Sequence, residues 1–288
     1  MSGYTRETIR RFNIKPTKSL GQNFLQDESV VNKIVNSADI SDNDIVVEIG
    51  PGTGAMTFQL AKHAEFVAAV EIDRRLIPVL NETLGHFSNV SVINMDILDI
   101  DLKNGVINGL GLGDRINSER HVKVVANLPY YITTPIIMKF LEETSDVDTM
   151  VFMVQKEVAD RMTAKSGGKD YGALSVAVQY YSKPEKLFNV PPHCFIPQPE
   201  VESTVIKLSR YEKPPVDLED KDVFFKVVKA AFAQRRKTLV NALYNSPYFN
   251  KSKDELKDIL EGLGIKENQR GETLSITQFA QLANTLVN

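Results

Sequence analysis

The stretch Asp44-Ile-Val-Val-Glu-Ile-Gly-Pro-Gly-Thr-Gly54 decides the fold, because an apolar strand runs directly into a glycine-rich turn. Residues 44–49 are typical of a buried strand, and residues 55–62 have helical spacing. Glycines in such a turn let the backbone approach a ligand closely, and the helix start favours a carboxylate or phosphate. The stretch therefore predicts an α/β fold with a ligand site at the end of its first core strand.

The alternation of strand and helix continues along the chain. It predicts right-handed crossovers in a doubly wound, mostly parallel sheet. The expected strands are 66–72, 90–95, 122–126 and 149–154, and the expected helices are 76–84 and 135–142. Residues 173–181 and 203–208 follow with no obvious amphipathic helix between them, so we expect an antiparallel pair at the sheet edge.

The texture of the sequence changes after residue 208. Residues 211–220 form a charged linker with two prolines. Helical spacing returns at 223–244, 253–263 and 276–286. We therefore expect two domains, an α/β domain over 1–211 and a small all-α domain over 212–288.

Composition narrows the class of protein. The 288 residues are 42% hydrophobic and 25% charged, which is ordinary for a soluble globular protein. No apolar run has the length of a membrane span and no apolar signal core begins the chain, so we expect a cytoplasmic protein without a membrane partner. Cys194 is the only cysteine and the four histidines are scattered, so we expect no disulfide and no metal.

Positive charge is concentrated in two segments, although the net charge is −3. Residues 1–37 hold six basic and three acidic side chains, and residues 221–243 hold six basic and one acidic. Either segment alone is typical of a solvated helix face. Together with the pocket for a base amine that residues 127–130 predict (below), they favour RNA binding.

Two acidic side chains stand at the ends of the next two expected strands. Glu71 stands 21 residues after Gly50, where an acid can bind both ribose hydroxyls of a nucleotide. A dinucleotide and S-adenosylmethionine fit this pattern equally, and a tight turn with a surface acid is the plain alternative. Asp96 can accept from an adenine amine beside Ile97, and a nicotinamide enzyme has no evident use for it. Asp96 therefore favours S-adenosylmethionine.

Asn127-Leu-Pro-Tyr130 follows the strand at 122–126. The Asn127 amide oxygen and a backbone carbonyl near Pro129 can accept both hydrogens of an exocyclic amine, and Tyr130 offers a face for stacking. Two acceptors stabilise the positive charge that develops when such an amine attacks a methyl group. The alternative is a strand that simply ends in a turn.

Several motifs together resemble one family, the small-subunit ribosomal RNA adenine dimethyltransferases (the KsgA, or RsmA, family). The motifs are Lys18-Ser-Leu-Gly-Gln-Asn-Phe-Leu25, Glu48–Gly54, Glu71-Ile-Asp73, Asn127–Tyr130, Gln155–Arg161, Phe195-Ile-Pro-Gln-Pro-Glu-Val201 and Phe232–Leu239. The resemblance runs from about residue 15 to the carboxyl terminus. It implies a Rossmann-like class I methyltransferase fold with S-adenosylmethionine as cofactor.

The resemblance also implies the substrate. It implies four methyl transfers to N6 of two adjacent adenosines in a 3′-terminal hairpin loop of 16S ribosomal RNA, during biogenesis of the small subunit. Bases in a loop can be splayed out and read, whereas A-form helices hide their edges. The expected partner is 16S RNA in an immature small subunit. No heptad or large apolar stripe calls for a second copy, so we expect a monomer.

The resemblance assigns roles to individual residues. Cofactor binding falls to Asn23, Leu25, Gly50, Gly52, Glu71, Ile72, Asp96, Ile97 and Asn127. The catalytic set is Asn127, Leu128, Pro129, Tyr130 and Phe195. Tyr130 and Phe195 are expected to stack on opposite faces of the extruded base, although Phe195 alone equally fits an apolar plug. Residues 22–25 are expected to fold over the cofactor as a lid, although they also suit a helix-capping loop.

Basic side chains near these motifs are candidates for phosphate contacts. For each residue alone, simple solvent exposure is the more common explanation. The candidates are Lys15, Lys18, Lys156, Arg161, Arg235, Arg236 and Lys237, with Lys165 and Lys169 in a loop between them.

Two other functions compete with this interpretation. A resistance methyltransferase of 23S ribosomal RNA would share the core and pocket, but Leu128 and Gly21 depart from that pattern. A non-catalytic ribosome-assembly factor would keep the fold, but intact Glu71, Asp96 and Asn127 disfavour it.

Overall fold

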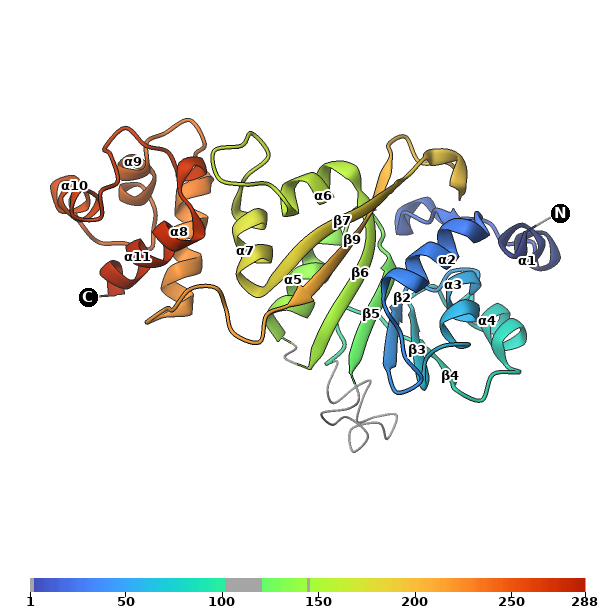
Figure 1. The fold of residues 1–288 in the computed structure, drawn as a ribbon. Helices are drawn as coiled ribbons and strands as arrows, with labels where there is room; N and C mark the ends of the chain where they lie inside the picture. Colours follow the sequence, from blue (N-terminus) through green and yellow to red (C-terminus); the bar gives the residue numbers. More distant parts are fainter. Residues whose placement is uncertain (1–2, 102–120, 144–145, 288) are drawn as a thin grey trace. The chain divides into compact units, whose positions relative to one another are not determined.

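The computed structural model describes residues 3–101, 121–143 and 146–287. The chain forms two compact units (Figure 1). The first comprises Met1–Ala159 with Lys183–Arg210, and the second comprises Asp160–Ser182 with Tyr211–Asn288. The last crossing falls between Arg210 and Tyr211, and residues 160–182, expected in the first domain, belong to the second unit. The domain division expected after residue 211 stays a prediction.

The first unit is built on a seven-stranded sheet in the order β4-β3-β2-β5-β6-β9-β7 (Figure 1). The strands from β4 to β6 are parallel neighbours, and β9 is antiparallel to β6. Their bounds are β2 Ile45–Ile49, β3 Phe66–Glu71, β4 Val90–Asn94, β5 Val122–Asn127, β6 Val147–Gln155, β7 Ser182–Val190 and β9 Ser203–Arg210. The predicted doubly wound, mostly parallel sheet is confirmed.

Helices cover the sheet because its strands are apolar on both faces. All of β2 is buried. Val46, Val67 and Val125 pack in one hydrophobic cluster with residues of helices α2 and α3. The helices of this unit are α1 Tyr4–Phe12, α2 Glu28–Ser37, α3 Ala55–Leu60, α4 Ile77–Leu84 and α5 Thr133–Glu143. The Asp27 side chain caps α2 by accepting from the amides of Ser29 and Val30.

The register of the parallel strands brings their carboxyl ends to one edge. Ile49 pairs with both Val70 and Ala126, and Glu71 pairs with Asn94. The residues that follow these strands therefore meet, as ligand-binding residues do at the carboxyl edge of open α/β sheets.

A short two-stranded sheet lies outside the main one. Phe24–Leu25 (β1) pairs antiparallel with Phe195–Ile196 (β8), so that Leu25 faces Phe195 across the pair. The segment that precedes the first core strand is thereby tied to the proline-rich loop before β9.

Of the antiparallel strand pair expected at residues 173–181 and 203–208, the first strand is wrong. Residues 173–181 form helix α7 (Ala173–Tyr181), and the strand beside β9 is β7. This helix lacks an amphipathic pattern because it is buried on nearly every side, from Leu174 through Val178 to Tyr180. A uniformly apolar run of this length does not distinguish helix from strand.

The second unit is helical and has its own core. Phe224, Leu239, Leu256 and Phe279 are fully buried in it. Besides α7 it contains α8 Lys221–Ala233, α9 Leu239–Tyr244, α10 Lys253–Gly262 and α11 Ile276–Val287, while α6 Lys156–Met162 spans the division between the units.

The single helix expected over residues 223–244 is wrong, because the structure ends α8 at Ala233 and starts α9 at Leu239. The break falls at Gln234-Arg-Arg-Lys-Thr238. The Leu239 amide donates to the Gln269 carbonyl instead of continuing the helix. A partner 30 residues away in the chain therefore sets this boundary.

Candidate functional site

A cavity opens at the carboxyl edge of the sheet. It encloses about 750 Å³ of empty space, open solvent included. Its walls come from the glycine-rich turn after β2, from the ends of β3, β4 and β5, and from residues 20–24. We call residues 17–26 the lid.

The cavity collects most of the predicted site residues. The ones that line it are Asn23, Gly50, Gly52, Glu71, Ile72, Asp96, Ile97, Asn127, Leu128, Pro129 and Tyr130. Two predicted residues are not among its lining. Leu25 lines a second cavity that shares Phe24, Gly50, Gly52 and Asn127 with the first, and Phe195 lines neither.

Phe195 occupies the plug position that the sequence left as its alternative. Its side chain is 1% exposed and packs in the hydrophobic cluster that contains Leu25, Val31 and Val205. In this conformation the ring offers no face to a base. Its role as a stacking partner stays a prediction that requires the ring to leave this cluster.

Glycines shape the floor of the cavity. Gly50 has a φ of 66°, and a Cβ built on it would meet nothing within 4 Å, so it would stand in the open space of the cavity. A Cβ on Gly52 would come within 2.9 Å of the Phe24 ring, which belongs to the lid. Glycine suits Gly50 because its φ is positive, and Gly52 because its φ is also positive and the Phe24 ring leaves no room for a Cβ.

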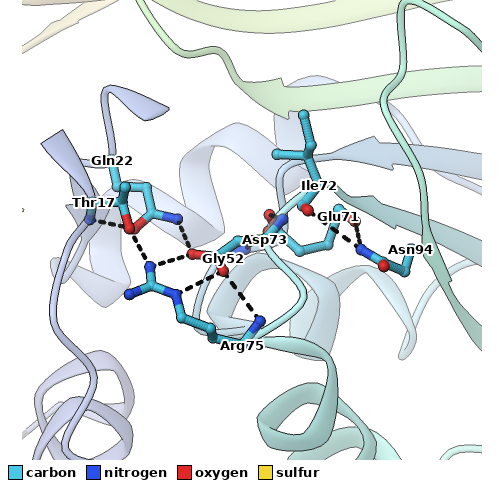
Figure 2. A network of polar contacts seen from close by, with 8 residues as sticks. All are labelled: Thr17, Gln22, Gly52, Glu71, Ile72, Asp73, Arg75 and Asn94. Atoms are coloured by element: carbon cyan, nitrogen blue, oxygen red, sulfur yellow. Dashed lines mark hydrogen bonds and ion pairs between the residues drawn. The ribbon is translucent and has the colours of Figure 1, made fainter. Parts of the chain in front are cut away.

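Glu71 is buried under the glycine-rich turn. Its two carboxylate oxygens accept from the amides of Gly52, at 3.1 Å, and Asp73, at 2.8 Å (Figure 2). Burial raises the pKa of Glu71 above its usual range, while these amides oppose the rise. The Asn94 side chain holds the strand end in place by donating to the Glu71 carbonyl at 2.8 Å.

A polar clasp joins the lid to the turn after β3 (Figure 2). Of its members only Gln22 had a predicted role, as part of the lid. Gln22 donates to Asp73 at 2.9 Å, and the Thr17 amide donates to Gln22 at 2.8 Å. Arg75 forms an ion pair with Asp73 at 2.5 Å and contacts the Thr17 hydroxyl. The Arg75 guanidinium is the main cause that lowers the pKa of Asp73 to about 2.

The sequence held a signal for this clasp. Gln22 and Asp73 both lie inside the motifs already noted, and an arginine two residues after an acid is a common local pair. Nothing in the sequence indicated that Gln22 and Asp73, which are 51 positions apart, lie next to each other.

An apolar wall with one acid suits a flat ring. Ile72 and Met95 are 43% and 45% exposed, although both are large and hydrophobic, and both line the cavity. The Asp96 carboxylate uses Oδ1 to accept from the Leu98 amide at 2.9 Å. A carboxylate has further acceptor positions for an amine on the ring.

Asn127 is oriented by the lid. Its Nδ2 donates to the Asn23 carbonyl at 3.0 Å, which requires the amide nitrogen to face the lid and leaves Oδ1 as the free acceptor. The Pro129 carbonyl already accepts from the Ile132 amide and the Thr133 hydroxyl. The Leu128 carbonyl has no such donor in the described chain.

Two tyrosines follow. The Tyr130 hydroxyl is within 2.8 Å of the Ser203 hydroxyl on β9, which fixes the plane of its half-buried ring, and burial raises the pKa of Tyr130. Tyr131 also lines the cavity and is 55% exposed. No role had been predicted for Tyr131.

Glu48 is the least expected feature of the site. It is fully buried at the end of β2, lines the second cavity, and neither carboxylate oxygen makes a hydrogen bond in the described chain. Burial raises the pKa of Glu48 to about 8, while the neighbouring Thr57 hydroxyl opposes the rise and the Glu71 carboxylate adds to it. A buried carboxylate without a partner is costly unless a cation pairs with it.

These features fit S-adenosylmethionine. Its adenine suits the wall of Ile72, Met95 and Asp96, and its ribose hydroxyls suit Glu71. Its ammonium group is the kind of cation that the orphaned Glu48 carboxylate lacks. The open space above Gly50 accommodates the rest of the molecule.

The basic candidates fall in both units. Lys15 precedes the lid, Lys18 lies within it, and both are exposed, while Lys156 forms an ion pair with Glu202 at 2.9 Å. Arg161 lies on α6, in the part that belongs to the second unit.

The remaining candidates, Arg235, Arg236 and Lys237, lie in the break between α8 and α9 and differ in their contacts. The Arg235 guanidinium donates to the carbonyls of Lys169 and Tyr171, so it has a structural task. Arg236 and Lys237 are exposed.

The described part of the chain contains neither a candidate metal site nor a candidate membrane-spanning helix. Residues 3–101, 121–143 and 146–287 contain no cluster of three or more histidine, cysteine or acidic side chains placed to hold a metal. Among the same residues, no helix has the length and apolar character needed to cross a bilayer.

Sequence comparison identifies close relatives. A family model described as ribosomal RNA adenine dimethylase matches residues 13–287. The protein named ribosomal RNA small subunit methyltransferase A of Alkaliphilus oremlandii is 52% identical over 282 residues, covering 98% of this chain and 96% of the relative. Its namesake from Clostridioides difficile is 51% identical, covering 98% of this chain and 94% of the relative.

Solved structures give the same picture. A dimethyladenosine transferase from Plasmodium falciparum superposes with a TM-score of 0.72 at 27% identity, covering 90% of this chain and 95% of that one. The 23S rRNA methyltransferase ErmE superposes with a TM-score of 0.68 at 24% identity, covering 92% and 100%. The second similarity is one of fold alone.

Glu48 generates a prediction about stability. Its folded pKa is about 8 and its ordinary value is 4.5, so the folded state keeps a proton that the unfolded state releases between these pH values. The contribution of Glu48 to the free energy of unfolding therefore falls as pH rises from 5 to 8, by up to about 1.4 kcal/mol per pH unit. We expect Glu48→Gln to gain stability relative to the parent over this range, in cofactor-free urea unfolding.

The matched control is Glu185→Gln, which removes an exposed carboxylate on β7. Its unfolding free energy should follow that of the parent at every pH. Parallel profiles for Glu48→Gln and the parent would contradict the assignment.

Proposed function

This chain belongs to the ribosomal RNA adenine dimethylase family, and we propose that it methylates N6 of two adjacent adenosines in a 3′-terminal hairpin loop of 16S ribosomal RNA. It is an S-adenosylmethionine-dependent methyltransferase. The observation that carries the proposal is the Asn127 amide, because the lid leaves its oxygen free as an acceptor inside the cavity.

Asn127 and the Leu128 carbonyl are the two acceptors that we assign to the adenine amine. An exocyclic amine is a poor nucleophile because its lone pair is delocalised into the ring. Acceptors on both hydrogens favour a pyramidal nitrogen and stabilise the positive charge that develops on it. The Leu128 carbonyl replaces the Pro129 carbonyl in this role, since the latter already has two donors.

Tyr130 positions the base. Its ring lines the cavity directly after the two acceptors, and its hydroxyl is anchored to Ser203 on a strand of the main sheet. A ring fixed in this way can stack on an extruded adenine without losing further rotational freedom. Stacking sets the plane of the base, so both amine hydrogens can reach their acceptors at the same time.

The cofactor side of the cavity would hold S-adenosylmethionine next to the substrate amine. S-adenosylmethionine, when bound, supplies an electrophilic methyl group on a sulfonium sulfur. Glu71 would hold the ribose, Asp96 the adenine amine and Glu48 the ammonium group, while Gly50 leaves room for the backbone contact. The lid then excludes water and limits the motion of the reacting groups.

We assign RNA binding to exposed basic residues, of which Arg236 and Lys237 of the second unit are the best placed. The expected partner is 16S RNA in an immature small subunit, where the hairpin loop is accessible. We further propose that the protein acts as a monomer in the cytoplasm, where ribosome assembly takes place in bacteria.

The choice of RNA is the first test. Incubation with radiolabelled S-adenosylmethionine and immature small subunits should place label on paired adenosines of the 3′-terminal hairpin loop, mapped by nuclease digestion and chromatography. Mature large subunits are the control substrate. Label confined to 23S RNA would instead support the resistance-type activity, and the absence of transfer to either RNA would support a non-catalytic assembly factor.

Asn127→Ala tests the amine acceptor. We expect the single-turnover rate of methyl transfer to fall at least a hundredfold, on the order of the loss when one preorganised polar group of an active site is removed. Cofactor affinity, measured by calorimetry, should fall much less. Asn81→Ala removes an exposed amide on α4 and should match the parent. An unchanged rate for Asn127→Ala would defeat the mechanism.

The double variant Arg236→Ala/Lys237→Ala tests the RNA contact. Each lost phosphate contact should lower the slope of log affinity against log salt by about one. The control Lys253→Ala/Lys266→Ala removes two exposed charges from the same unit. Equal slopes for the two double variants would assign Arg236 and Lys237 to ordinary surface.

A further inference from the structure

Helix α1 (Tyr4–Phe12) lies outside the residues that the family model matches, yet it is fastened to the lid. Along its first turn, the Tyr4 amide donates to the Glu28 side chain at 3.0 Å, and Arg6 Nε donates to the Gln26 side chain at 2.6 Å. Gln26 is the last residue of the lid, and Glu28 is the first residue of helix α2. The helix thus contacts the carboxyl-terminal end of the lid, opposite the clasp at Asp73.

Thr5 makes the central contact of this attachment. Its side chain is 1% exposed, and its hydroxyl donates to the Leu25 carbonyl at 2.7 Å. The same hydroxyl lies 3.3 Å from the Thr53 hydroxyl in the glycine-rich turn. Because Thr5 has a single hydroxyl hydrogen, the Thr53 hydroxyl must be the donor in the second contact. One buried side chain therefore bridges the lid and the floor of the cavity.

Leu25, which accepts from Thr5, is two residues from Asn23, whose carbonyl orients the Asn127 amide. Leu25 follows Asn23 closely along the lid, and the Asn23 carbonyl accepts from Asn127 Nδ2 at 3.0 Å. Phe24, between them, packs on Gly52 of the same turn. Any shift of the lid away from the turn would release the Asn23 carbonyl and free the Asn127 amide to rotate.

We propose that α1 is a positioning element for methyl transfer: the Thr5 hydroxyl holds the lid against the glycine-rich turn and thereby keeps the Asn127 amide oxygen aimed at the substrate amine. The inference rests on the proposed function of Asn127 and deepens it. Thr5 itself touches neither the cofactor nor the base. It acts through the lid backbone.

Hydrogen exchange in the cofactor-free protein tests the attachment directly. Thr5→Val keeps the volume of the side chain and removes the hydroxyl. We expect amides of residues 17–26 to exchange about tenfold faster, as for the loss of one buried hydrogen bond. Thr5→Ser should restore the parent rate. Thr8→Val, on the same helix and also buried, should match the parent, since no hydrogen bond joins Thr8 to the described lid residues.

Binding and turnover test the consequence. Thr5→Val should weaken the affinity for S-adenosylmethionine about tenfold and lower the single-turnover rate, while the affinity for RNA stays unchanged. Lid exchange and cofactor affinity equal to those of the parent would overturn the proposal. So would a uniform rise in exchange across the first unit, because that result would assign Thr5 to general stability.

Arg6→Gln provides a second variant in case Thr5→Val does not fold. Arg6 is exposed, so its replacement leaves the core intact, and we expect about twofold faster exchange confined to the lid. An unchanged lid in Arg6→Gln would then overturn the proposal. A parent protein that fails to bind S-adenosylmethionine would contradict the proposed function, whereas binding by the parent with no effect at Thr5 contradicts this inference alone.

Discussion

The site depends on the parallel register of β2, β3, β4 and β5. Parallel strands end at a common edge, so side chains that follow them converge without any contact between their segments in the sequence. The register places Ile49 beside both Val70 and Ala126, and it carries Glu71 and Asn127 to either side of the glycine-rich turn. A slip of one residue in any of these pairs would turn the ends of that strand to the other face.

The lid converts this open edge into a site. It is held at one end by Gln22 and Asp73 and at the other by its pairing with β8 and by α1. Between these points it supplies the carbonyl that orients Asn127. The same segment therefore lines the cavity and orients the Asn127 amide, so under the proposed function one segment would serve both cofactor binding and the substrate amine.

Electrostatics divide the acids of the site into two kinds. Asp73 is ion-paired with Arg75, and its pKa falls to about 2, so it remains charged and structural. Glu48 and Glu71 are buried and lack a cationic partner in the described chain, and burial raises the pKa of both. Two backbone amides offset part of the cost of burial at Glu71, whereas the Glu48 oxygens accept no hydrogen bond in the described chain, so an ammonium group beside Glu48 would lower its cost.

The sequence by itself determined the fold class and most of the cavity, because the strands are apolar runs and the site residues follow them directly, as Gly50, Glu71, Asp96 and Asn127 do. It left undecided whatever depends on distant partners: the helix at 173–181, whose burial on all sides erases its period, the break before Leu239, and the burial of Phe195. Only the tertiary structure joined Gln22 to Asp73 and Thr5 to the lid, since hydrogen bonds between segments leave no periodic pattern in either segment.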